Sequence, residues 1–267
     1  IWRGVNDTEE LVREIYTMSF RLGCYIATQF KPIVAKTIYE MSNAKTVLDT
    51  SMGWGDRLTG FYASNATHYI GCDPNPNTFE RYHKMIKFYD DLTGGKKTTQ
   101  IYRCAAEDLP WDEIPNDIDI MFSSPPYFAT ERYAEGSKFQ DDQSWSRYNS
   151  YEEWRDGFYL PVMKKAFDKL SPGGWLMVNI MDPKVKGNRY KACDNLVNDL
   201  KEFFKGQIGM RIMSRPKSIK SFEGDTHEER KAKYDEWQAK WFIESVWCFQ
   251  KPGGEDVDLF APYKDST

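Results

Sequence analysis

The feature that most constrains the fold of this chain is an alternation of two patterns. Short apolar or β-branched runs predict strands at 46–49, 68–73, 100–104, 118–123, 175–181, 208–213 and 242–250. Longer stretches with helical periodicity lie between them at 57–64, 77–92, 151–170 and 192–204, and before them at 8–22 and 33–41. Strands that alternate with helices in this way form a parallel sheet that carries helices on both faces. The sequence therefore predicts an α/β fold.

The composition is that of a globular chain with a substantial core. Hydrophobic residues make up 40% and charged residues 28% of the 267 residues, which fits one large α/β domain. We find no internal repeat and no linker that would split the chain, so we expect a main domain at 46–252. Polar inserts interrupt this domain at 129–150, 182–191 and 214–240. A helical segment at 1–45 precedes it, and a tail at 253–267 follows it.

Several classes of protein are disfavoured by the same sequence. The longest apolar stretch, at 175–181, is too short to cross a bilayer. The chain opens on Ile1 without the pattern of a secretory signal, and a trimmed start stays open. The cysteines are scattered and far from the histidines, so we expect no metal site, no disulfide scaffold and a reducing, intracellular setting. A net charge of −4 argues against a strongly basic, DNA-coating protein, but it permits a local basic surface.

A turn that contains two glycines follows the first predicted strand. It reads Asp49-Thr-Ser51-Met-Gly53-Trp-Gly55 and opens a helix. The glycines allow the backbone to turn tightly and to approach a ligand without a Cβ atom in the way. The carboxylate of Asp49 disfavours a pyrophosphate and favours a cationic group, and the third glycine of the dinucleotide-binding motif is missing. A strand-to-helix turn without a ligand is the alternative at this point.

Acidic residues follow the next two predicted strands. Asp73 lies about twenty residues after the glycine turn, where nucleoside-binding folds hydrogen-bond ribose hydroxyls. Glu107 and Asp108 follow the third strand, where a carboxylate can accept a hydrogen bond from an exocyclic amine such as that of adenine. Each acid by itself also suits a helix N-cap. Together, at successive strand ends, these acids predict a nucleoside pocket with a negative rim.

Two prolines follow the fourth predicted strand directly, between Ser124 and Tyr127. Pro125 and Pro126 stiffen the backbone and lack amide donors, which leaves carbonyl oxygens available as acceptors. These carbonyls and the Ser124 hydroxyl can accept the hydrogens of a substrate amino group, while Tyr127 offers a flat face to a planar base. The alternative is a rigid turn with a packed aromatic residue. We expect the next residue, Phe128, to be in the core rather than to form a second wall.

These motifs resemble those of S-adenosylmethionine-dependent amino-methyltransferases, which modify adenine N6 or cytosine N4. The segment 124–127 resembles their (Asp/Asn/Ser)-Pro-Pro-(Tyr/Phe/Trp) motif, and 49–55 resembles their Asp-x-x-x-Gly-x-Gly cofactor motif. The segment 30–32, Phe-Lys-Pro, looks like an element that packs beside the cofactor methionine. The resemblance spans 29–252 and implies a class I, Rossmann-like methyltransferase fold. Its sheet would have seven mostly parallel strands, with the last hairpin strand antiparallel.

The resemblance also implies the cofactor and the site residues. The cofactor would be S-adenosylmethionine, held by Phe30, Asp49, Ser51, Gly53, Gly55, Asp73, Glu107, Asp108 and Ser124. The catalytic residues would be Ser124, Pro125, Pro126 and Tyr127. When Ser124 and the Pro125 carbonyl accept the amino hydrogens, the nitrogen lone pair points at the methyl group, which then transfers in line. In duplex DNA the base would be flipped out and stacked on Tyr127.

The nature of the methyl acceptor is less constrained. DNA is the expected substrate, and the serine at 124 favours cytosine N4 over adenine N6, although both stay open. RNA or a protein glutamine amide is an alternative acceptor, and a catalytically inactive, nucleic-acid-binding subunit is an alternative of another class. No block long enough for a large target-recognition domain is visible. The inserts, a missing segment or a recognition subunit would then supply specificity, and a restriction nuclease partner stays open.

Two predicted loops are locally basic, and both follow strands that end at the same sheet edge as 124–127. Such loops suit contacts with phosphates, although solvated surface lysines are the alternative for each. Their cations are Lys184, Lys186, Arg189 and Lys191 in the first loop, and Arg211, Arg215, Lys217 and Lys220 in the second. The insert at 129–150 is a candidate to close over the target. The stretch at 226–240 predicts an amphipathic helix.

Overall fold

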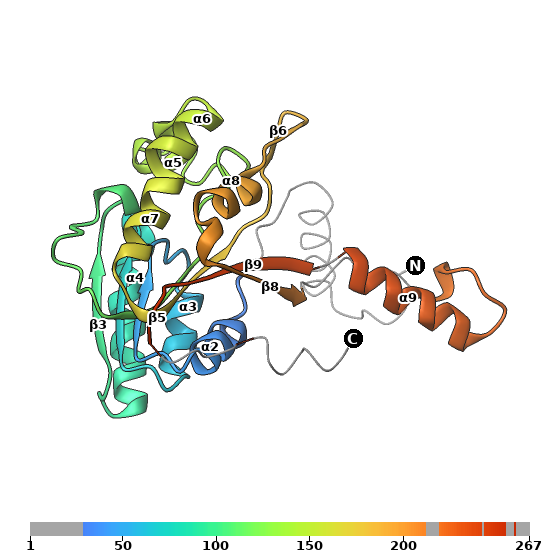
Figure 1. The fold of residues 1–267 in the computed structure, drawn as a ribbon, viewed down its shortest axis with the longest axis horizontal. Helices are drawn as coiled ribbons and strands as arrows, with labels where there is room; N and C mark the ends of the chain where they lie inside the picture. Colours follow the sequence, from blue (N-terminus) through green and yellow to red (C-terminus); the bar gives the residue numbers. More distant parts are fainter. Residues whose placement is uncertain (1–28, 212–218, 242, 255–258, 260–267) are drawn as a thin grey trace, which may run out of the picture. The chain divides into compact units, whose positions relative to one another are not determined.

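The computed structural model describes residues 29–211, 219–241, 243–254 and 259 (Figure 1). Seven strands form one sheet in the order β3-β2-β1-β4-β5-β9-β8. The first five are parallel to one another, whereas β9 pairs antiparallel with both β5 and β8. This is the arrangement that the resemblance to class I methyltransferases implies. The predicted α/β fold, with seven strands and an antiparallel last strand, is confirmed.

The strand boundaries follow the predicted runs most closely in the centre of the sheet. The strands are β1 (Thr46–Asp49), β2 (His68–Cys72), β3 (Thr98–Tyr102), β4 (Ile118–Ser123), β5 (Leu170–Asn179), β8 (Phe204–Arg211) and β9 (Ile243–Gln250). β1 and β4 match the prediction residue for residue. β5 begins earlier than predicted, because Leu170 already pairs with Ile118 of β4 before the Ser-Pro-Gly-Gly sequence that resembles a turn. Pairing with a neighbouring strand thus outweighs local turn chemistry there.

The helices lie close to the predicted stretches. The longer ones are α2 (Pro32–Met41), α3 (Asp56–Tyr62), α4 (Pro76–Thr93), α7 (Leu160–Asp168), α8 (Ala192–Asp199) and α9 (His227–Trp241). α4 shows how sequence sets such a boundary. The Asn75 side chain accepts a hydrogen bond from the Asn77 amide at 3.0 Å, and the helix ends at Gly94, whose φ of 79° suits glycine. The helix predicted at 8–22 lies outside the described residues.

The helix predicted at 151–170 is interrupted. α6 (Tyr151–Trp154) is followed by a π-helical turn (Arg155–Tyr159) before α7 begins. Pro161 has no amide hydrogen to donate to the carbonyl of Gly157, four residues earlier. The Tyr148 hydroxyl lies 3.2 Å from that carbonyl oxygen and donates to it instead. A Cβ atom at Gly157 would come within 2.6 Å of the Tyr148 ring, so this contact requires glycine.

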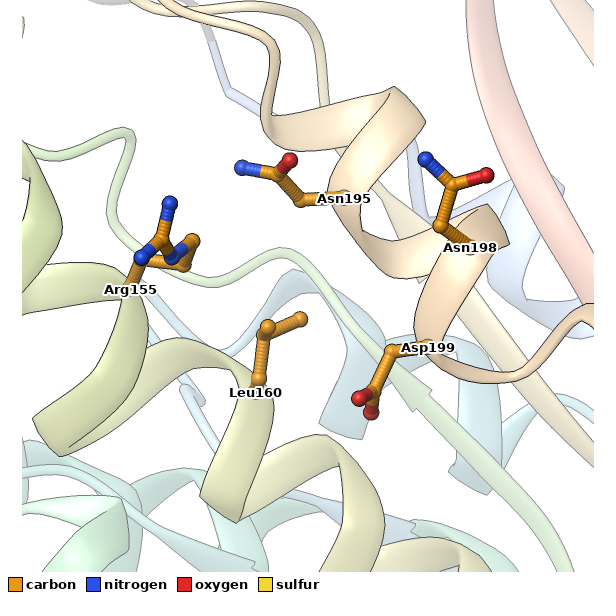
Figure 2. Close-up of a pocket in the computed structure, with 5 residues that line it drawn as sticks. All are labelled: Arg155, Leu160, Asn195, Asn198 and Asp199. Atoms are coloured by element: carbon orange, nitrogen blue, oxygen red, sulfur yellow. The ribbon is translucent and has the colours of Figure 1, made fainter.

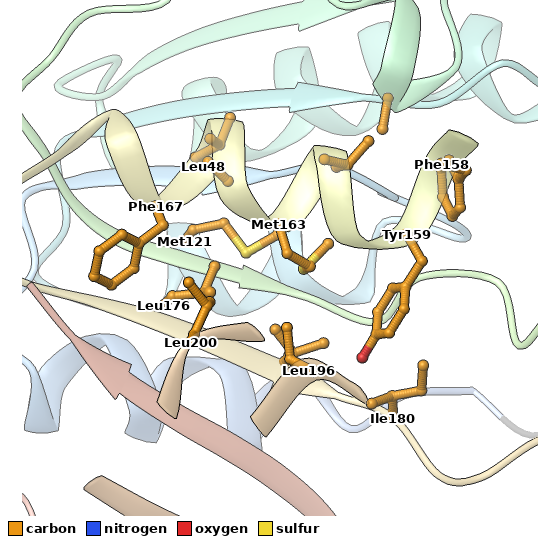
Figure 3. Packing of buried hydrophobic residues seen from close by; sticks show 14 of the residues in the cluster. Leu48, Met121, Phe158, Tyr159, Met163, Phe167, Leu176, Ile180, Leu196 and Leu200 are labelled. Atoms are coloured by element: carbon orange, nitrogen blue, oxygen red, sulfur yellow. The ribbon is translucent and has the colours of Figure 1, made fainter. Parts of the chain in front are cut away.

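The two faces of the sheet are covered by different helices. On one face Leu48, Met121 and Leu176, from β1, β4 and β5, form a core cluster with residues of α7 and α8 (Figure 3). On the other face Phe122 meets Tyr39 of α2 edge-on, with ring centroids 6.2 Å apart. Successive residues of β4 therefore point to opposite faces, as the period of a strand requires. Complete burial of such side chains contributes about 1.5–3 kcal/mol each.

The predicted inserts contain short elements of their own. The first, at 129–150, contains α5 (Ser144–Arg147), and the second, at 182–191, forms a hairpin of β6 (Lys184–Val185) and β7 (Asn188–Arg189). The third contains the helix predicted at 226–240, which is α9, but its apolar residues are not segregated on one face, so the prediction that this helix is amphipathic is wrong. The Phe222 ring packs on Tyr234 and Trp237. None of the helices in the described ranges has the length and apolar character of a membrane span. The domain boundaries at 45 and 252 stay predictions.

Candidate active site

The ends of β1 and β4 meet at the point where the strand order of the sheet reverses. β1 pairs with β2 on one side and with β4 on the other. From β1 the chain adds β2 and β3 on one side, and it then returns to add β4 and β5 on the other side, so the strand order reverses between β1 and β4. Ligands of open α/β sheets bind beyond the carboxyl ends of the strands at such a point. The glycine turn follows β1 and the Pro-Pro motif follows β4. The structure thus brings together two motifs that are far apart in the sequence.

A direct hydrogen bond joins the two strand ends. The hydroxyl of Ser123, the last residue of β4, donates to Oδ1 of Asp49 at 3.0 Å. Both residues are completely buried. The Tyr69 hydroxyl and the Ser51 amide also donate to this carboxylate, at 2.7 and 3.2 Å. Asp49 is therefore a buried acceptor that ties the glycine turn to the strand preceding the Pro-Pro motif.

The cationic partner that the sequence predicts for Asp49 comes from the chain itself. Arg57 is 4% exposed and donates to both carboxylate oxygens, from Nε at 3.0 Å and from Nη2 at 3.2 Å. It also donates to the carbonyl oxygen of Ser51. Burial acts to lower the pKa of the Arg57 guanidinium. The charge and hydrogen bonds of Asp49 outweigh this effect, so the pKa is raised above its usual value and the group stays charged. Sequence reasoning missed Arg57, and its place in the first turn of the helix after Asp49 was the available signal.

The two glycines adopt the left-handed conformation, which permits the tight turn that the sequence predicts. Gly53 and Gly55 have φ angles of 58° and 84°. A Cβ atom at Gly55 would come within 2.7 Å of the Met85 side chain, whereas one at Gly53 would meet nothing closer than 3.9 Å. The Tyr82 hydroxyl donates to the carbonyl of Gly53. The Met85 side chain therefore packs closely against Gly55, whereas space is left beside the Cα atom of Gly53.

Asp73 lies beside this turn and is 9% exposed. It accepts hydrogen bonds from the Gly53 amide and the Asn75 amide at 2.9 Å, and from the Thr78 hydroxyl at 3.3 Å. Burial raises the pKa of its carboxyl to about 6, although these hydrogen bonds oppose the shift. Asn75, rather than Asp73, caps α4. The N-cap alternative is therefore wrong for Asp73.

The acid pair after β3 has a partner in the first insert. Glu107 and Asp108 lie in the short 3-10 turn Ala106–Asp108, and Nη1 of Arg147 contacts them at 3.0 and 2.7 Å. The Tyr148 hydroxyl lies 3.2 Å from the same oxygen of Glu107. The second oxygen of Glu107, Oε2, is buried and has no hydrogen-bond partner among the described residues. A buried acceptor in this state is costly, and an amino group of a ligand would satisfy it.

The Pro-Pro motif forms a tight turn with one occupied and one available carbonyl. The carbonyl of Pro126 accepts from the Phe128 amide at 2.9 Å. No donor within the described residues contacts the carbonyl of Pro125. Phe128 has a φ of 50° and is 5% exposed, with Tyr151 and Trp154 against its ring. The prediction that it is a core residue is confirmed.

Tyr127 is half-buried, and its hydroxyl is tied to the neighbouring strands. It donates to Oε1 of Glu244 on β9 and lies 3.3 Å from the carbonyl oxygen of Asn179 at the end of β5. Burial and the charge of Glu244 raise the pKa of Tyr127 well above its usual range, and a hydrogen bond with Ser124 opposes this. Burial also raises the pKa of the nearby Glu131. Sequence reasoning missed both glutamates. Glu244 lies 117 positions after Tyr127, so no local pattern connects these two residues, whereas Glu131 lies only four residues after Tyr127.

The basic loop at 182–191 is the β6–β7 hairpin. Lys184 and Arg189 face each other across it, and Lys186 is at its tip with a φ of 49°. All three side chains are exposed. At the base of the hairpin, Tyr190 stacks on Tyr151 with ring centroids 4.6 Å apart. The hairpin is thus anchored to the aromatic cluster around Phe128, directly beside the Pro-Pro motif.

Other predicted residues are less informative. Arg215 and Lys217 lie outside the described residues, whereas Lys220 is exposed in the 3-10 turn Ile219–Ser221. Phe30 is half-buried, and its contact with a cofactor stays a prediction.

A shallow pocket of about 310 Å³ lies between α7 and α8 (Figure 2). It contains none of the predicted site residues, since its lining consists of Arg155, Leu160, Asn195, Asn198 and Asp199.

Residues 118–257, more than half of the chain, match the DNA methylase family of N6 and N4 amino-methyltransferases. The chain belongs to this family. The match begins at β4 and therefore includes the Pro-Pro motif, the hairpin and β9. No curated protein is significantly similar to the sequence of this methyltransferase.

Solved structures with a similar fold include other methyltransferases. A methyltransferase from Geobacter sulfurreducens is 10% identical, with a TM-score of 0.46 over 94% of this chain and 92% of that one. An S-adenosylmethionine-dependent O-methyltransferase from Thermotoga maritima is 13% identical, with a TM-score of 0.46 over 92% and 72% of the two chains. An rRNA methylase from Streptococcus thermophilus is 12% identical, with a TM-score of 0.45 over 85% and 99%. These similarities concern the fold.

Proposed function

We propose that the protein transfers the methyl group of S-adenosylmethionine to an exocyclic amino group of a base in DNA, either cytosine N4 or adenine N6. One observation carries this proposal. Ser123 directly precedes the Pro-Pro motif, and its hydroxyl donates a hydrogen bond to Asp49 at the start of the glycine turn. The glycine turn and the Pro-Pro motif therefore share one sheet edge, which supports a cofactor and an acceptor amine bound side by side. Membership of the DNA methylase family supports DNA as the substrate.

The residues around the turn fit the cofactor. The space over Gly53 admits a ligand, and the buried Asp73 beside it presents a carboxylate suited to ribose hydroxyls. The unpartnered Oε2 of Glu107 suits the adenine amino group. Asp49 and Ser51 would act by holding the turn in place. When bound, S-adenosylmethionine supplies an electrophilic methyl group on a sulfonium.

The Pro-Pro motif would orient the acceptor nitrogen. An exocyclic amine is a weak nucleophile because its lone pair is delocalised into the ring. The Ser124 hydroxyl and the available Pro125 carbonyl would accept its two hydrogens, which favours a tetrahedral nitrogen with a directed lone pair. The ring of Tyr127 would stack on the base once the base has left the duplex. Catalysis on this view comes from positioning and electrostatics, without a covalent enzyme intermediate.

The β6–β7 hairpin would contact the DNA backbone. The hairpin follows β5, and β5 pairs with β4, the strand that precedes the Pro-Pro motif. Its exposed cations are Lys184, Lys186 and Arg189. Phosphate contacts of this kind position a duplex without reading its sequence. Lys220 would add a contact from the loop after β8. The specificity for a target sequence would come from the inserts or from a recognition subunit.

The test is a labelled methyl-transfer assay with three acceptors. The protein is incubated with labelled S-adenosylmethionine and with duplex DNA, RNA or protein, and the digest is analysed by mass spectrometry. We expect N4-methylcytosine or N6-methyladenine from DNA. Label in RNA or in glutamine instead would contradict the proposed substrate. Calorimetric titration with S-adenosylmethionine addresses the inactive alternative, since a protein that binds no cofactor cannot carry out this reaction.

A further inference from the structure

The hydroxyl end of Tyr127 is held more firmly than stacking on a base requires. It donates to the Glu244 carboxylate and lies 3.3 Å from the carbonyl oxygen of Asn179. Glu244 lies on β9, and Asn179 is the last residue of β5. Two strands of the central sheet therefore hold the tip of a side chain whose backbone lies in a loop. No motif in the sequence assigns a role to Glu244.

The acceptors themselves are fixed by the sheet. Asn179 is 2% exposed, pairs with Val246 in the β5–β9 ladder, and donates from its side chain to the Ser245 carbonyl at 3.2 Å. Glu244 pairs with Met210 of β8. Strand pairing thus fixes the backbone of both acceptor residues. A tyrosine bonded to them has one orientation instead of several rotamers.

The loop end of Tyr127 is constrained as well. Its carbonyl accepts from the Thr130 amide at 3.0 Å, and the Phe128 amide closes the turn on Pro126. Glu131, four residues after Tyr127, lies close enough to Glu244 for their charges to interact. Two carboxylates close to a site for a polyanion oppose its binding by charge repulsion. The charge of Glu244 is therefore by itself unfavourable for DNA binding. The hydrogen bond from Tyr127 gives this carboxylate a favourable interaction that offsets the cost.

We propose that Glu244 is a positioning residue that fixes the Tyr127 ring for stacking on the target base. This inference rests on the proposed function. Orienting the ring before the base arrives reduces the conformational entropy lost in forming the stacked complex. Glu244 would therefore act on base binding and turnover. It would have little effect on cofactor binding, because most of the predicted cofactor contacts lie at or after the ends of β1, β2 and β3.

The experiment compares three single variants with the parent protein. Glu244→Ala removes the acceptor, Glu244→Gln keeps an oxygen at the same place, and Tyr127→Phe keeps the ring but removes the donor. The substrate is unmethylated duplex DNA with labelled S-adenosylmethionine, and kcat and the KM for DNA are measured separately. Calorimetry gives the cofactor dissociation constant, and urea unfolding monitors folding. Glu202→Gln is the control, since it removes one negative charge from an exposed position before β8.

We expect Glu244→Ala and Tyr127→Phe each to lower kcat/KM for DNA by about tenfold to hundredfold, as for a lost hydrogen bond to a charged group. Glu244→Gln should restore most of this, and the double variant Tyr127→Phe with Glu244→Ala should be no worse than either single variant. Cofactor affinity should stay within about twofold throughout, and Glu202→Gln should behave as the parent.

Other results would overturn the inference. Multiplying losses in the double variant would mean that the two residues act independently. A loss of cofactor affinity or of cooperative unfolding in Glu244→Ala, without rescue by Glu244→Gln, would mean that Glu244 only supports the fold. If the parent protein itself transfers no label to DNA, the proposed function is wrong and this inference is wrong with it. That outcome is recognised from the parent alone.

Discussion

The hydroxyl of Ser123 lies 3.0 Å from the carboxylate of Asp49 and donates a hydrogen bond to it across the centre of the sheet. Asp49 also forms an ion pair with Arg57, so a single buried charge pair lies between the glycine turn and the Pro-Pro motif. A shift of this carboxylate would move both motifs together. The geometry between cofactor and acceptor amine therefore depends on a group that need not contact either of them.

The first prediction concerns the Asp49–Arg57 pair. Replacing Arg57 by Met leaves a completely buried carboxylate without its cation, and this should lower the free energy of unfolding by about 3–5 kcal/mol. Urea unfolding followed by circular dichroism measures the change. As a control, the double variant Asp49→Asn with Arg57→Met should recover part of the loss, because no uncompensated charge remains. Equal or greater destabilisation in the double variant would contradict the charge argument.

The second prediction concerns Asp73 and the cofactor. Replacing Asp73 by Ala should weaken S-adenosylmethionine binding by about 1–3 kcal/mol, because a charge-assisted hydrogen bond to the ribose is lost. In the parent the dissociation constant should rise as the pH falls through about 6, the pKa of this carboxyl, because the protonated form loses acceptor capacity. Calorimetry between pH 5 and about pH 8 checks both effects. A folded Asp73→Ala variant with unchanged affinity would remove Asp73 from the pocket.

The same carboxyl has a predictable effect on stability. Its pKa in the folded protein is raised from 3.8 to about 6, so the folded state binds the proton more tightly than the unfolded state does. The contribution of Asp73 to the free energy of unfolding is therefore present at low pH and is lost as the pH rises from about 4 to about 6. Comparing urea unfolding of the parent with that of Asp73→Asn over this range isolates the contribution. A difference that does not depend on pH would contradict the raised pKa.

The third prediction concerns Tyr127. Replacing it by Ala should lower turnover on DNA by about tenfold to hundredfold, since base stacking on an aromatic ring contributes about 1–3 kcal/mol. The affinity for S-adenosylmethionine should change little. Phe88→Ala provides a matched control, because this aromatic residue is 61% exposed and lies on α4, outside the inserts. If turnover and cofactor affinity fall together, or if neither changes, Tyr127 is a packing residue.

The fourth prediction concerns Arg147. It contacts one oxygen each of Glu107 and Asp108, next to the unpartnered Oε2 of Glu107, so its guanidinium competes with the adenine amino group for the negative charge of these carboxylates. Replacing Arg147 by Gln should therefore tighten S-adenosylmethionine binding by up to about fivefold, the value of a partly exposed ion pair. Arg132→Gln, which breaks the pair with Glu135 in the same insert, should leave the affinity unchanged. Weaker binding in Arg147→Gln would show that Arg147 supports the pocket.

Local patterns predict the central strands and the motifs that follow them. β1 and β4 are short apolar runs bounded by polar residues, and their boundaries could be read from the sequence. The tight turn at Gly53 and Gly55 could also be predicted, because glycine adopts left-handed conformations at little cost. The interruption of the helix after Trp154 could not be placed as readily. It involves the Tyr148 hydroxyl, at the end of the first insert, which replaces the hydrogen bond that Pro161 is unable to donate.

The partners of the site residues could not be predicted, because they come from distant elements. Arg147 meets Glu107 only because the first insert folds back over the end of β3. Glu244 meets Tyr127 because β9 pairs antiparallel with β5. Hydrophobic periodicity determines which face of a strand is buried, and it contains no information on which polar side chains meet across a sheet. Such pairs follow from topology and register.

The last prediction concerns the hairpin and DNA. Because the chain has a net charge of −4, binding to a polyanion must depend on local cations. Each cation that contacts a phosphate contributes about 0.9 to the slope of log affinity against log salt. Neutralising Lys184, Lys186 and Arg189 to Gln should therefore flatten this slope by about 2.7 and weaken binding to all duplex sequences alike. Fluorescence anisotropy with a labelled duplex at several salt concentrations measures the slope.

A matched control separates phosphate contacts from a general change in charge. Replacing Arg81, Lys84 and Lys96 by Gln removes the same number of lysines and arginines from exposed positions on α4 and before β3. This variant should weaken DNA binding only slightly and should keep the salt dependence of the parent, because long-range attraction between exposed charges is screened within about 8–10 Å at physiological salt. Methylation of a short oligonucleotide at high concentration should suffer less in the hairpin variant than binding does, because Ser124 and Tyr127 are unchanged. If both triple variants alter the slope equally, the hairpin is ordinary solvated surface, and the phosphate contacts must come from another part of the chain.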